Sequence, residues 1–527
     1  MSTLFSLFRF EKSTACVIYI IYTTIVFFIN AVSKFFLQKE QKMKEFGVLC
    51  HVTCLPAKTG LGDFGKSAYE FLDFLKSQKL SLWQILPLNN ANEFNCPYGP
   101  LSTQAIDEMF VDLDDLKDRG LLEEKEYKHL YKFTKTKKVK FSKIRPEKER
   151  LFALAYSRIA EEDKKQLEKI AKQHKHIYEY AYYRTMLAKF GQKSWRFVED
   201  QYWDIYGKVG KMFVKENKDQ FLKFVFFQYI LHEQWTKIKT YANSLGIKIL
   251  GDVPMYCDKD SVDVFAGKEW FKLDDNCMPT VTAGCPPDVF SSVAQDWQTC
   301  IYQWDKMKKD NFSYMTNRLC LLLDKYDMLR LDHFPGYVRY YEHAKAPGTK
   351  TQYVDGGGSE FFAQLKTLVD FKKLFVEDLS DEKSATGKVI KEFSLRKMNV
   401  LQYGFDTDKN NPHLPQNVKA NIVYYAGTHD SATFLGFLKK QSKQQIEKIK
   451  LLTNSQAKNL KGLQLDCIRS MLASKAEYVV LQAQDFMFQD DRWRMNYPGV
   501  AAGCWEYRLC KDYQKKMSKM LAQLGQK

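Results

Sequence analysis

The chain has 527 residues, of which 45% are hydrophobic and 15% aromatic. It can bury one large core or two ordinary ones, which indicates a globular protein. Its formal charge of +17 would suit a nucleic-acid partner, but no nucleic-acid motif accompanies the charge. Much of the excess lies in a basic run from Lys132 to Arg150, which is typical of a solvated loop and helix face. We therefore expect no nucleic acid as a partner.

The cysteines indicate reduced thiols. Twelve of them are scattered from Cys16 to Cys510 without regular pairing, which does not suit a disulfide framework and favours the cytoplasm for the catalytic part. Cys50 and Cys54 flank His51, but no second Cys/His pair nearby completes a four-ligand metal site. We expect neither a metal nor an organic cofactor.

The N-terminal extension, residues 1–43, contains a mostly apolar stretch, Ala15–Val32, with basic residues on both sides. The stretch is long enough to span a bilayer. Alternatively, Ala31–Ser33 offers small residues for signal-peptide cleavage, or translation starts at Met43. The sequence leaves these three alternatives open. Membrane contact is expected through residues 15–32 only.

From Gly47 onward, short apolar runs alternate with helical patterns, which predicts parallel strands joined by crossover helices. Polar residues follow several of these runs, as they do at the carboxyl ends of strands in a (β/α)8 barrel. The predicted fold is therefore α/β, a TIM barrel over residues 44–527. The eight strands are expected at Gly47–Leu49, Leu82–Leu86, Lys248–Gly251, Met328–Leu331, Lys373–Val376, Asn399–Tyr403, Asn421–Tyr425 and Tyr478–Leu481.

Two long excursions interrupt the barrel. The connection between the second and third strands is far longer than a βα loop needs, which predicts an inserted, mostly helical subdomain at about 105–220. Helical patterns cover Tyr178–Phe190 and Lys218–Leu245. A second excursion, at about 255–311, is rich in Pro, Asp and aromatic residues, and we expect this loop over the active-site face, where it can hold substrate.

Three acids follow predicted strands: Asp332 the fourth, Glu377 the fifth and Asp430 the seventh. Arg330 lies two residues before Asp332, on the same face of a strand, where it keeps the carboxylate ionised and aimed. Retaining glycoside chemistry needs a carboxylate nucleophile and a protonated acid about 5 to 5.5 Å apart, which neighbouring strands can provide. Taken alone, Arg330 and Asp332 also fit a structural pair that closes a strand.

From about Phe46 to Leu509 the sequence resembles the amylomaltases or disproportionating enzymes, 4-α-glucanotransferases related to the α-amylases. Many ordered motifs carry the resemblance, which implies a barrel enzyme that transfers α-1,4-glucan segments in starch, glycogen or maltodextrin metabolism. The motifs are Leu55-Pro-Ala-Lys-Thr-Gly-Leu-Gly-Asp-Phe-Gly65, Gly251-Asp-Val-Pro254, Ala283-Gly-Cys-Pro-Pro-Asp-Val-Phe-Ser291, Arg330-Leu-Asp-His-Phe334, Val376-Glu-Asp-Leu379, Gly427-Thr-His-Asp430 and Arg494-Met-Asn-Tyr-Pro-Gly499.

The resemblance also implies roles for single residues. Asp332 corresponds to the nucleophile, Glu377 to the general acid/base and Asp430 to the stabiliser of the transition state. The implied partners are an α-1,4-glucan donor and acceptor. Six positions match substrate-binding residues of the family, with Tyr98 as a stacking tyrosine and Trp297 as an aromatic platform: Arg330, His333, His429, Tyr98, Asp288 and Trp297.

The sequence departs from the family pattern at four places. These departures leave the three acids intact and affect acceptor preference, chain-length preference and efficiency. They also motivate two alternatives, a catalytically impaired glucan-binding protein and an α-glucan hydrolase, while residues 15–32 motivate a membrane-tethered scaffold. The departures are Pro335 for an arginine, Ser431-Ala432 for Asn-Asp, Gln298-Thr299-Cys300 for a Gly-Asn-Pro turn, and Gly99-Pro100 for a more polar run.

Overall fold

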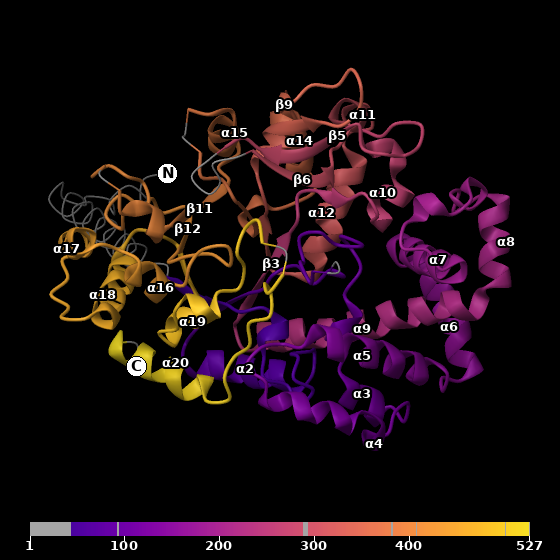
Figure 1. Ribbon diagram of the computed structural model, residues 1–527, viewed down its shortest axis with the longest axis horizontal. Coiled ribbons are helices and arrows are strands. Elements are labelled where there is room, and N and C mark those ends of the chain that lie inside the picture. The colour runs from indigo at the N-terminus through magenta and orange to yellow at the C-terminus, as the bar shows by residue number, and fades with distance from the viewer. Residues whose placement is uncertain are drawn as a thin grey trace, which may run out of the picture. The chain divides into compact units, whose positions relative to one another are not determined.

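Eight parallel strands close into a barrel (Figure 1). The protein is seen here as a computed structural model that describes residues 44–91, 94–287, 294–380, 383–406, 408–500 and 502–525. The apolar stretch Ala15–Val32 and the expected site residue Asp288 lie outside the described residues. The barrel strands are β1 (Glu45–Leu49), β2 (Leu82–Gln84), β3 (Lys248–Val253), β7 (Met328–Leu331), β10 (Leu374–Val376), β11 (Arg396–Val400), β12 (Ile422–Tyr425) and β13 (Tyr478–Gln482).

The barrel closes in the order β1-β13-β12-β11-β10-β7-β3-β2, and every neighbouring pair is parallel. Its strands are short, buried runs such as Ile-Val-Tyr-Tyr in β12, in which all four residues are buried. Such runs suit strands that are covered on both faces. The predicted (β/α)8 barrel is confirmed, including the pairing of β7 with β10 that places the fourth and fifth strands side by side.

The prediction for the sixth strand was displaced. The apolar pattern favoured Asn399–Tyr403, but β11 covers Arg396–Val400 and the chain then turns into a 3-10 helix over Leu401–Gly404. Arg396 enters the sheet because its guanidinium lies 2.9 Å from the carboxylate of Glu477. A buried charge with a partner can occupy a strand. The hydrophobic pattern alone does not reveal that partner, so it placed the strand too late in the chain.

Helices cover the outside of the barrel (Figure 1). Directly after α12 (Ser313–Lys325) the chain packs so closely that Gly251 of β3 is required, because a Cβ at this position would lie 2.3 Å from the ring of Tyr326. The helices outside the insertion are α2 (Lys66–Ser77), α11 (Trp304–Lys309), α12 (Ser313–Lys325), α13 (Pro335–Val338), α14 (Gly358–Lys366), α15 (Ala385–Phe393), α16 (Phe434–Lys439), α17 (Lys443–Leu452), α18 (Leu460–Ala473), α19 (Ala483–Phe486) and α20 (Tyr513–Gln523).

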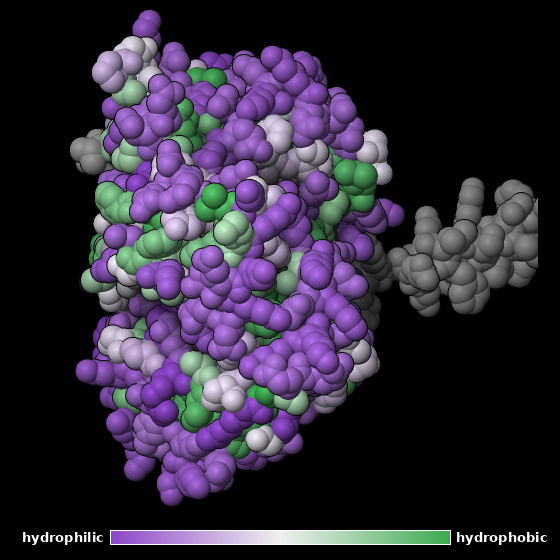
Figure 2. All heavy atoms as spheres, turned by 90° about the vertical axis from the view of Figure 1, so that its right-hand side faces the viewer, coloured by the Kyte–Doolittle hydropathy of each residue, from purple (hydrophilic) through white to green (hydrophobic). Residues whose placement is uncertain are grey.

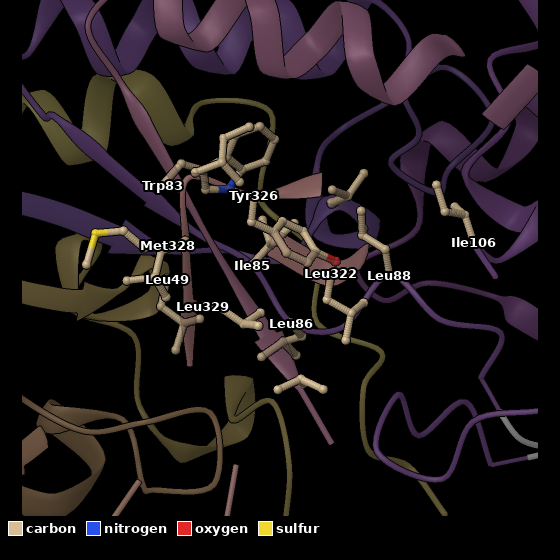
Figure 3. Close-up of a cluster of buried hydrophobic side chains, with 14 of the residues drawn as sticks. Leu49, Trp83, Ile85, Leu86, Leu88, Ile106, Leu322, Tyr326, Met328 and Leu329 are labelled. Atoms are coloured by element: carbon tan, nitrogen blue, oxygen red, sulfur yellow. The ribbon is translucent and has the colours of Figure 1, made fainter. Parts of the chain in front are cut away.

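A cluster of buried apolar and aromatic side chains lies between β2, β7 and α12 (Figure 3). The indole N–H of Trp83 donates to the carbonyl of Cys50 at 2.7 Å, so its burial leaves no unpaired donor. The side chains labelled there are Leu49, Trp83, Ile85, Leu86, Leu88, Ile106, Leu322, Tyr326, Met328 and Leu329.

The long connection between β2 and β3 is mostly helical, as predicted. The two helices expected from their patterns are present as α7 and α9, while the boundaries of about 105–220 stay a prediction. The helices of this helical insertion are α3 (Leu113–Asp118), α4 (Glu124–Tyr127), α5 (Phe141–Tyr156), α6 (Glu161–Gln173), α7 (Lys175–Phe190), α8 (Lys208–Glu216) and α9 (Lys218–Ser244).

The basic run is only in part a solvated face. Most of its lysines are exposed, but Lys148 is buried, and its ammonium group donates to Asp63 at 3.1 Å and to the carbonyls of Met109 and Val111. Arg145 pairs with Asp107 at 3.0 Å. The interpretation of these two residues as solvated was wrong, because their partners are far away in the sequence.

The second excursion is more regular than a loop. It contributes three strands to an antiparallel sheet that β8 and β9, after β7, complete in the order β4-β6-β5-β8-β9. Local patterns did not predict this sheet, because it joins the strands of the excursion to β8 and β9, which follow the barrel strand β7. The elements are β4 (Cys257–Asp258), α10 (Val262–Ala266), β5 (Val281–Cys285), β6 (Gln295–Cys300), β8 (Arg339–Ala344) and β9 (Gln352–Asp355).

Within the described part of the chain, no helix has both the length and the apolar character that a membrane crossing requires.

Candidate active site

Arg330 organises the carboxyl ends of three neighbouring strands. This residue of β7 is 2% exposed, and its Nη1 atom lies 2.7 Å from Asp252 at the end of β3 and 2.9 Å from Asp332. Its Nη2 atom lies 2.9 Å from Glu377, directly after β10. A buried guanidinium is tolerated when charge-assisted hydrogen bonds satisfy it. One arginine therefore aims three carboxylates toward the same space.

Asp332 and Glu377 form a coupled pair. Burial and the neighbouring Glu377 raise the pKa of Asp332 well above its ordinary value and outweigh the Arg330 guanidinium, contrary to the expectation that Arg330 keeps this carboxylate ionised. Burial also raises the pKa of Glu377, but the Arg330 guanidinium and the N–H of His333 outweigh it and lower that pKa. The two acids therefore titrate as one pair, with their pKa values moved in opposite directions.

Asp430 follows β12 and stands in a different environment. Its Oδ2 atom lies 3.3 Å from Nε2 of His429, and its Oδ1 atom accepts a hydrogen bond from Nδ2 of Asn496 at 2.6 Å. Arg494 donates to its carbonyl oxygen. Burial raises the pKa of Asp430, but His429 and Asn496 outweigh it, so that the pKa lies below its ordinary value. This carboxylate is ionised.

His333 links the acid pair to the second sheet. Its backbone has a φ of +42°, a conformation that residues other than glycine rarely adopt. Its N–H donates to Oε2 of Glu377 at 2.8 Å. Burial lowers the pKa of its imidazole to about 4, so the ring is neutral at pH 7. The edge of the Trp297 ring meets it with centroids 4.7 Å apart. The strained turn thus aims both a backbone donor and a neutral ring.

Tyr98 forms one wall of the site. Its ring stacks on His429 with centroids 5.0 Å apart and an interplanar angle of 7°, and its hydroxyl donates to Asp252 at 2.7 Å. Trp505 packs against both rings, with centroids 5.9 and 6.0 Å away. Because His429 covers one face of the Tyr98 ring, Tyr98 is held in position before any sugar binds.

The structure brings most of the expected residues into one place. Eight of the nine lie at or beside the carboxyl ends of β3, β7, β10 and β12 or on β6, and only Asp288 is outside the described residues. Their individual roles stay predictions. The eight are Asp332, Glu377, Asp430, Arg330, His333, His429, Tyr98 and Trp297.

Sequence reasoning did not assign three residues of this site: Asp252, Asn496 and Trp505. Asp252 stands in the quoted Gly251-Asp-Val-Pro motif and at the end of a predicted strand, so both signals were present. Asn496 lies in the quoted Arg494–Gly499 motif, but only the fold shows that it reaches Asp430. Nothing in the sequence marks Trp505 among the aromatic residues.

The departures from the family pattern have visible structural roles. Pro335 begins α13, where its fixed φ suits the first turn of a helix. The hydroxyl of Ser431 accepts from the N–H of Thr428 at 3.1 Å and so closes the turn that carries Asp430. Gln298 has a φ of +56° within β6, beside Trp297. Each substitution lies next to a site residue rather than at one.

Within the described residues, no group of three or more His, Cys, Asp or Glu side chains is arranged to hold a metal ion. The described cysteines are free thiols, and Cys50 and Cys54 are both buried.

A closed parallel barrel with three carboxylates at its strand ends defines a class of enzymes that act on glycosidic bonds, and comparison with known proteins places the chain within it. Residues 50–513 match the model of the family described as 4-alpha-glucanotransferase. The chain belongs to this family.

Relatives and a solved structure agree with the family match. The chain is 32% identical over 488 residues to the 4-alpha-glucanotransferase of Aquifex aeolicus, covering 92% of this chain and 99% of the relative. It is 30% identical over 479 residues to the chloroplastic/amyloplastic enzyme of Solanum tuberosum, covering 88% and 82%. The amylomaltase from Streptococcus agalactiae in complex with acarbose superposes with a TM-score of 0.85 at 26% identity, covering 92% and 99%. The resemblance found in the sequence is confirmed.

Proposed function

We propose that this chain is a 4-α-glucanotransferase that moves α-1,4-glucan segments from a donor to an acceptor glucan by retaining double displacement. The observation that carries the mechanism is the bridge from Arg330 to Asp332 and Glu377, at 2.9 Å each, on adjacent strands. This bridge fixes a nucleophile and an acid/base at one opening, which is the requirement of a retaining enzyme.

In the first step, Asp332 attacks the anomeric carbon while Glu377 protonates the departing glycosidic oxygen. The C–O bond to the leaving glucan breaks, and a glycosyl ester forms on the carboxylate of Asp332. For this step Glu377 carries the proton and Asp332 is ionised. The guanidinium of Arg330 stays within reach of both carboxylates throughout.

Positive charge develops on the sugar ring in the transition state. The ionised Asp430 supplies a negative charge on the sugar-facing side and accepts hydrogen bonds from sugar hydroxyls, which strengthen as the ring becomes electron-poor. His429 and Asn496 hold that carboxylate in position. Its partial exposure, 42% for the side chain, leaves room for the sugar.

In the second step, Glu377 acts as a base toward the acceptor. When the acceptor is the 4-hydroxyl of another glucan, its oxygen attacks the anomeric carbon, Asp332 leaves, and the proton returns to Glu377. When the acceptor is water, the product is a hydrolysed glucan. Trp297 lies at the edge of the site beside His333. We assign it the role of an aromatic platform that favours a sugar acceptor over water.

Incubation with maltotriose tests the proposal. We expect both glucose and chains longer than maltotriose to appear, and neither in the Asp332→Asn variant. Glucose and maltose without longer chains would indicate a hydrolase, and an unchanged substrate would indicate a glucan-binding protein or a scaffold. The departures from the family pattern at Pro335 and Ser431 are the reason to measure transfer against hydrolysis and binding.

We also place the catalytic part in the cytoplasm, where free thiols such as those of the described cysteines persist. With the catalytic part in the cytoplasm, residues 1–43 are a membrane anchor or an untranslated leader, whereas a signal peptide would carry the catalytic part out of the cytoplasm. Comparing the mass of the protein from its native cell with the full sequence separates the anchor, which keeps the full mass, from the other two.

A further inference from the structure

An apolar stripe lies on the exposed side of α8 in the helical insertion. The stripe consists of Tyr206, Val209 and Met212, which are 45%, 38% and 51% exposed. Residues three apart lie on the same side of a helix, and Tyr206 stands just before its first turn. The buried side of α8 is used elsewhere, because the Phe213 ring packs against Tyr202 with centroids 5.5 Å apart. The stripe is therefore not part of the core.

Lysines accompany the stripe. Lys208, Lys211 and Lys215 are exposed on the same helix, at spacings of three and four residues. Among the described residues these three lysines form no ion pair, whereas Lys218, the next lysine in the chain, lies 2.5 Å from Glu168. The stripe thus has a border of positive charges that remain available to a partner.

An apolar stripe bordered by lysines suits a partner that is both apolar and anionic. Figure 2 views the side of the molecule that carries α8 in Figure 1 and shows hydrophobic patches within a mostly hydrophilic face. Exposed apolar side chains beside lysines on one helix suit an interface that is apolar inside and anionic outside. We propose that the α8 stripe and its three lysines dock on an anionic phospholipid surface.

Two other occupants fit less well. A second copy would bring the same lysines face to face and adds its own charge of +17, so that a symmetric contact would be repulsive. A glucan is neutral and gains nothing from three unpaired lysines. The proposal does not depend on the transferase reaction, and it concerns a surface separate from residues 15–32, where the sequence alone suggested membrane contact.

An environment-sensitive fluorophore can test the contact directly. An unnatural amino acid that carries the fluorophore replaces Met212 in the full-length protein, which is then mixed with vesicles of phosphatidylcholine alone or with about 30% phosphatidylserine. We expect a blue shift and brighter emission with the anionic vesicles only. The matched control carries the same group at Leu451 of α17, a residue that is 83% exposed, and should not respond. A label at 212 reports local contact even if residues 15–32 bind every vesicle.

Charge and apolar variants separate the two contributions. Lys208→Glu together with Lys211→Glu should lower the affinity of the labelled site for anionic vesicles by about tenfold or more, because each lysine near such a surface contributes roughly fivefold. Tyr206→Ser with Val209→Ser should abolish the blue shift. Lys443→Glu on α17 should change neither. Thermal midpoints of the lysine variants should stay within about 1 °C, because those side chains are exposed. Tyr206→Ser also removes the stacking of its ring on Tyr178 and its hydrogen bond to Glu179, so a slightly lower midpoint is expected for that variant.

Several results would overturn the proposal. Equal responses to neutral and anionic vesicles would exclude an electrostatic contact, and no response to either would exclude docking altogether. If Tyr206→Ser with Val209→Ser weakens self-association in sedimentation velocity and leaves the vesicle response intact, the stripe is a contact between copies. If the variant weakens glycogen binding instead, the occupant is a glucan.

Discussion

Two aspartates follow neighbouring strands of the same barrel and have opposite properties. Asp430, after β12, is 42% exposed at its side chain, and its neighbours His429 and Asn496 lower its pKa. Asp485, after β13, is fully buried, one of its oxygens accepts from the N–H of Phe434 at 2.7 Å, and the other has no partner. Burial raises the pKa of Asp485 to about 7.

The comparison shows that position at a strand end does not make a carboxylate catalytic. Asp430 has donors on one side and open space on the other, so it is charged and can meet a sugar. Asp485 is fully buried, so its charged form is disfavoured and no sugar can reach it. The open region of the barrel mouth also contains Asp332 and Glu377, whose side chains are 21% and 29% exposed.

The largest effect is expected in the open region. Asp332→Asn removes the nucleophile with almost no change in volume, so turnover of maltotriose should fall by about 10⁴-fold or more. Glucan binding and the thermal midpoint should stay close to those of the wild type. Product analysis and calorimetry measure both quantities, and a variant that keeps more than a small fraction of activity would show that another group is the nucleophile.

Glu377→Gln should cost less, about 10²- to 10⁴-fold on natural glucans, because the nucleophile remains. A glycosyl fluoride needs little protonation to leave, so it should still react and accumulate as a covalent intermediate. Mass spectrometry of the digested variant should find the sugar on the peptide that contains Asp332. Failure to find labelled Asp332 would mean that Glu377 has a different role.

Asp430→Asn and Asp485→Asn form a matched pair that tests the comparison itself. The first should lower turnover by about 10²- to 10³-fold through the loss of a charge at the sugar, with little change in stability. The second should leave turnover unchanged. If both variants lose activity equally, the distinction between an open and a sealed carboxylate is wrong.

The stability of the Asp485→Asn variant should depend on pH. The folded pKa of Asp485, about 7, lies above its ordinary unfolded value near 3.9, so its contribution is complete below pH 4 and is lost as the pH rises through 7. An amide does not titrate. The variant should therefore gain stability relative to the wild type above pH 4, with a clearly larger gain at pH 8 than at pH 5, which denaturant titrations at the two pH values would measure.

The smallest effect is expected for removal of residues 1–42. The barrel closes with strands that begin at Glu45, and no strand position remains open. Expression from Met43 should therefore give the same maltotriose disproportionation and thermal midpoint as the full chain in detergent. A clear loss of either in the shortened chain would mean that the extension supports the fold that carries the open carboxylates.

Much of the barrel is readable from the sequence. Buried parallel strands are continuous apolar runs, and seven of the eight were placed within two residues of their observed ends. The acids after β7, β10 and β12 were identified because polar residues directly after such runs are unusual. The fourth strand was placed at its observed ends, Met328–Leu331, since the charged residues Arg330 and Asp332 mark where its apolar run ends.

Other features depend on contacts between distant segments. The antiparallel sheet of β4, β5, β6, β8 and β9, the shift of β11 toward Arg396, and the burial of Lys148 against Asp63 each rest on partners that local patterns do not name. The motifs around Asp252 and Asn496 were visible, but only folding brings their side chains to Arg330 and Asp430.

By itself, the sequence determined the type of fold and which acids stand at strand ends, because hydrophobic periodicity and chain order are local properties. The tertiary structure decided which of those acids is buried, which has a raised pKa and which has a lowered pKa. The charge of a carboxylate depends on solvent access and on the donors and cations within a few ångströms. Asp430 lies beside open space and polar neighbours, whereas Asp485 is buried within the fold.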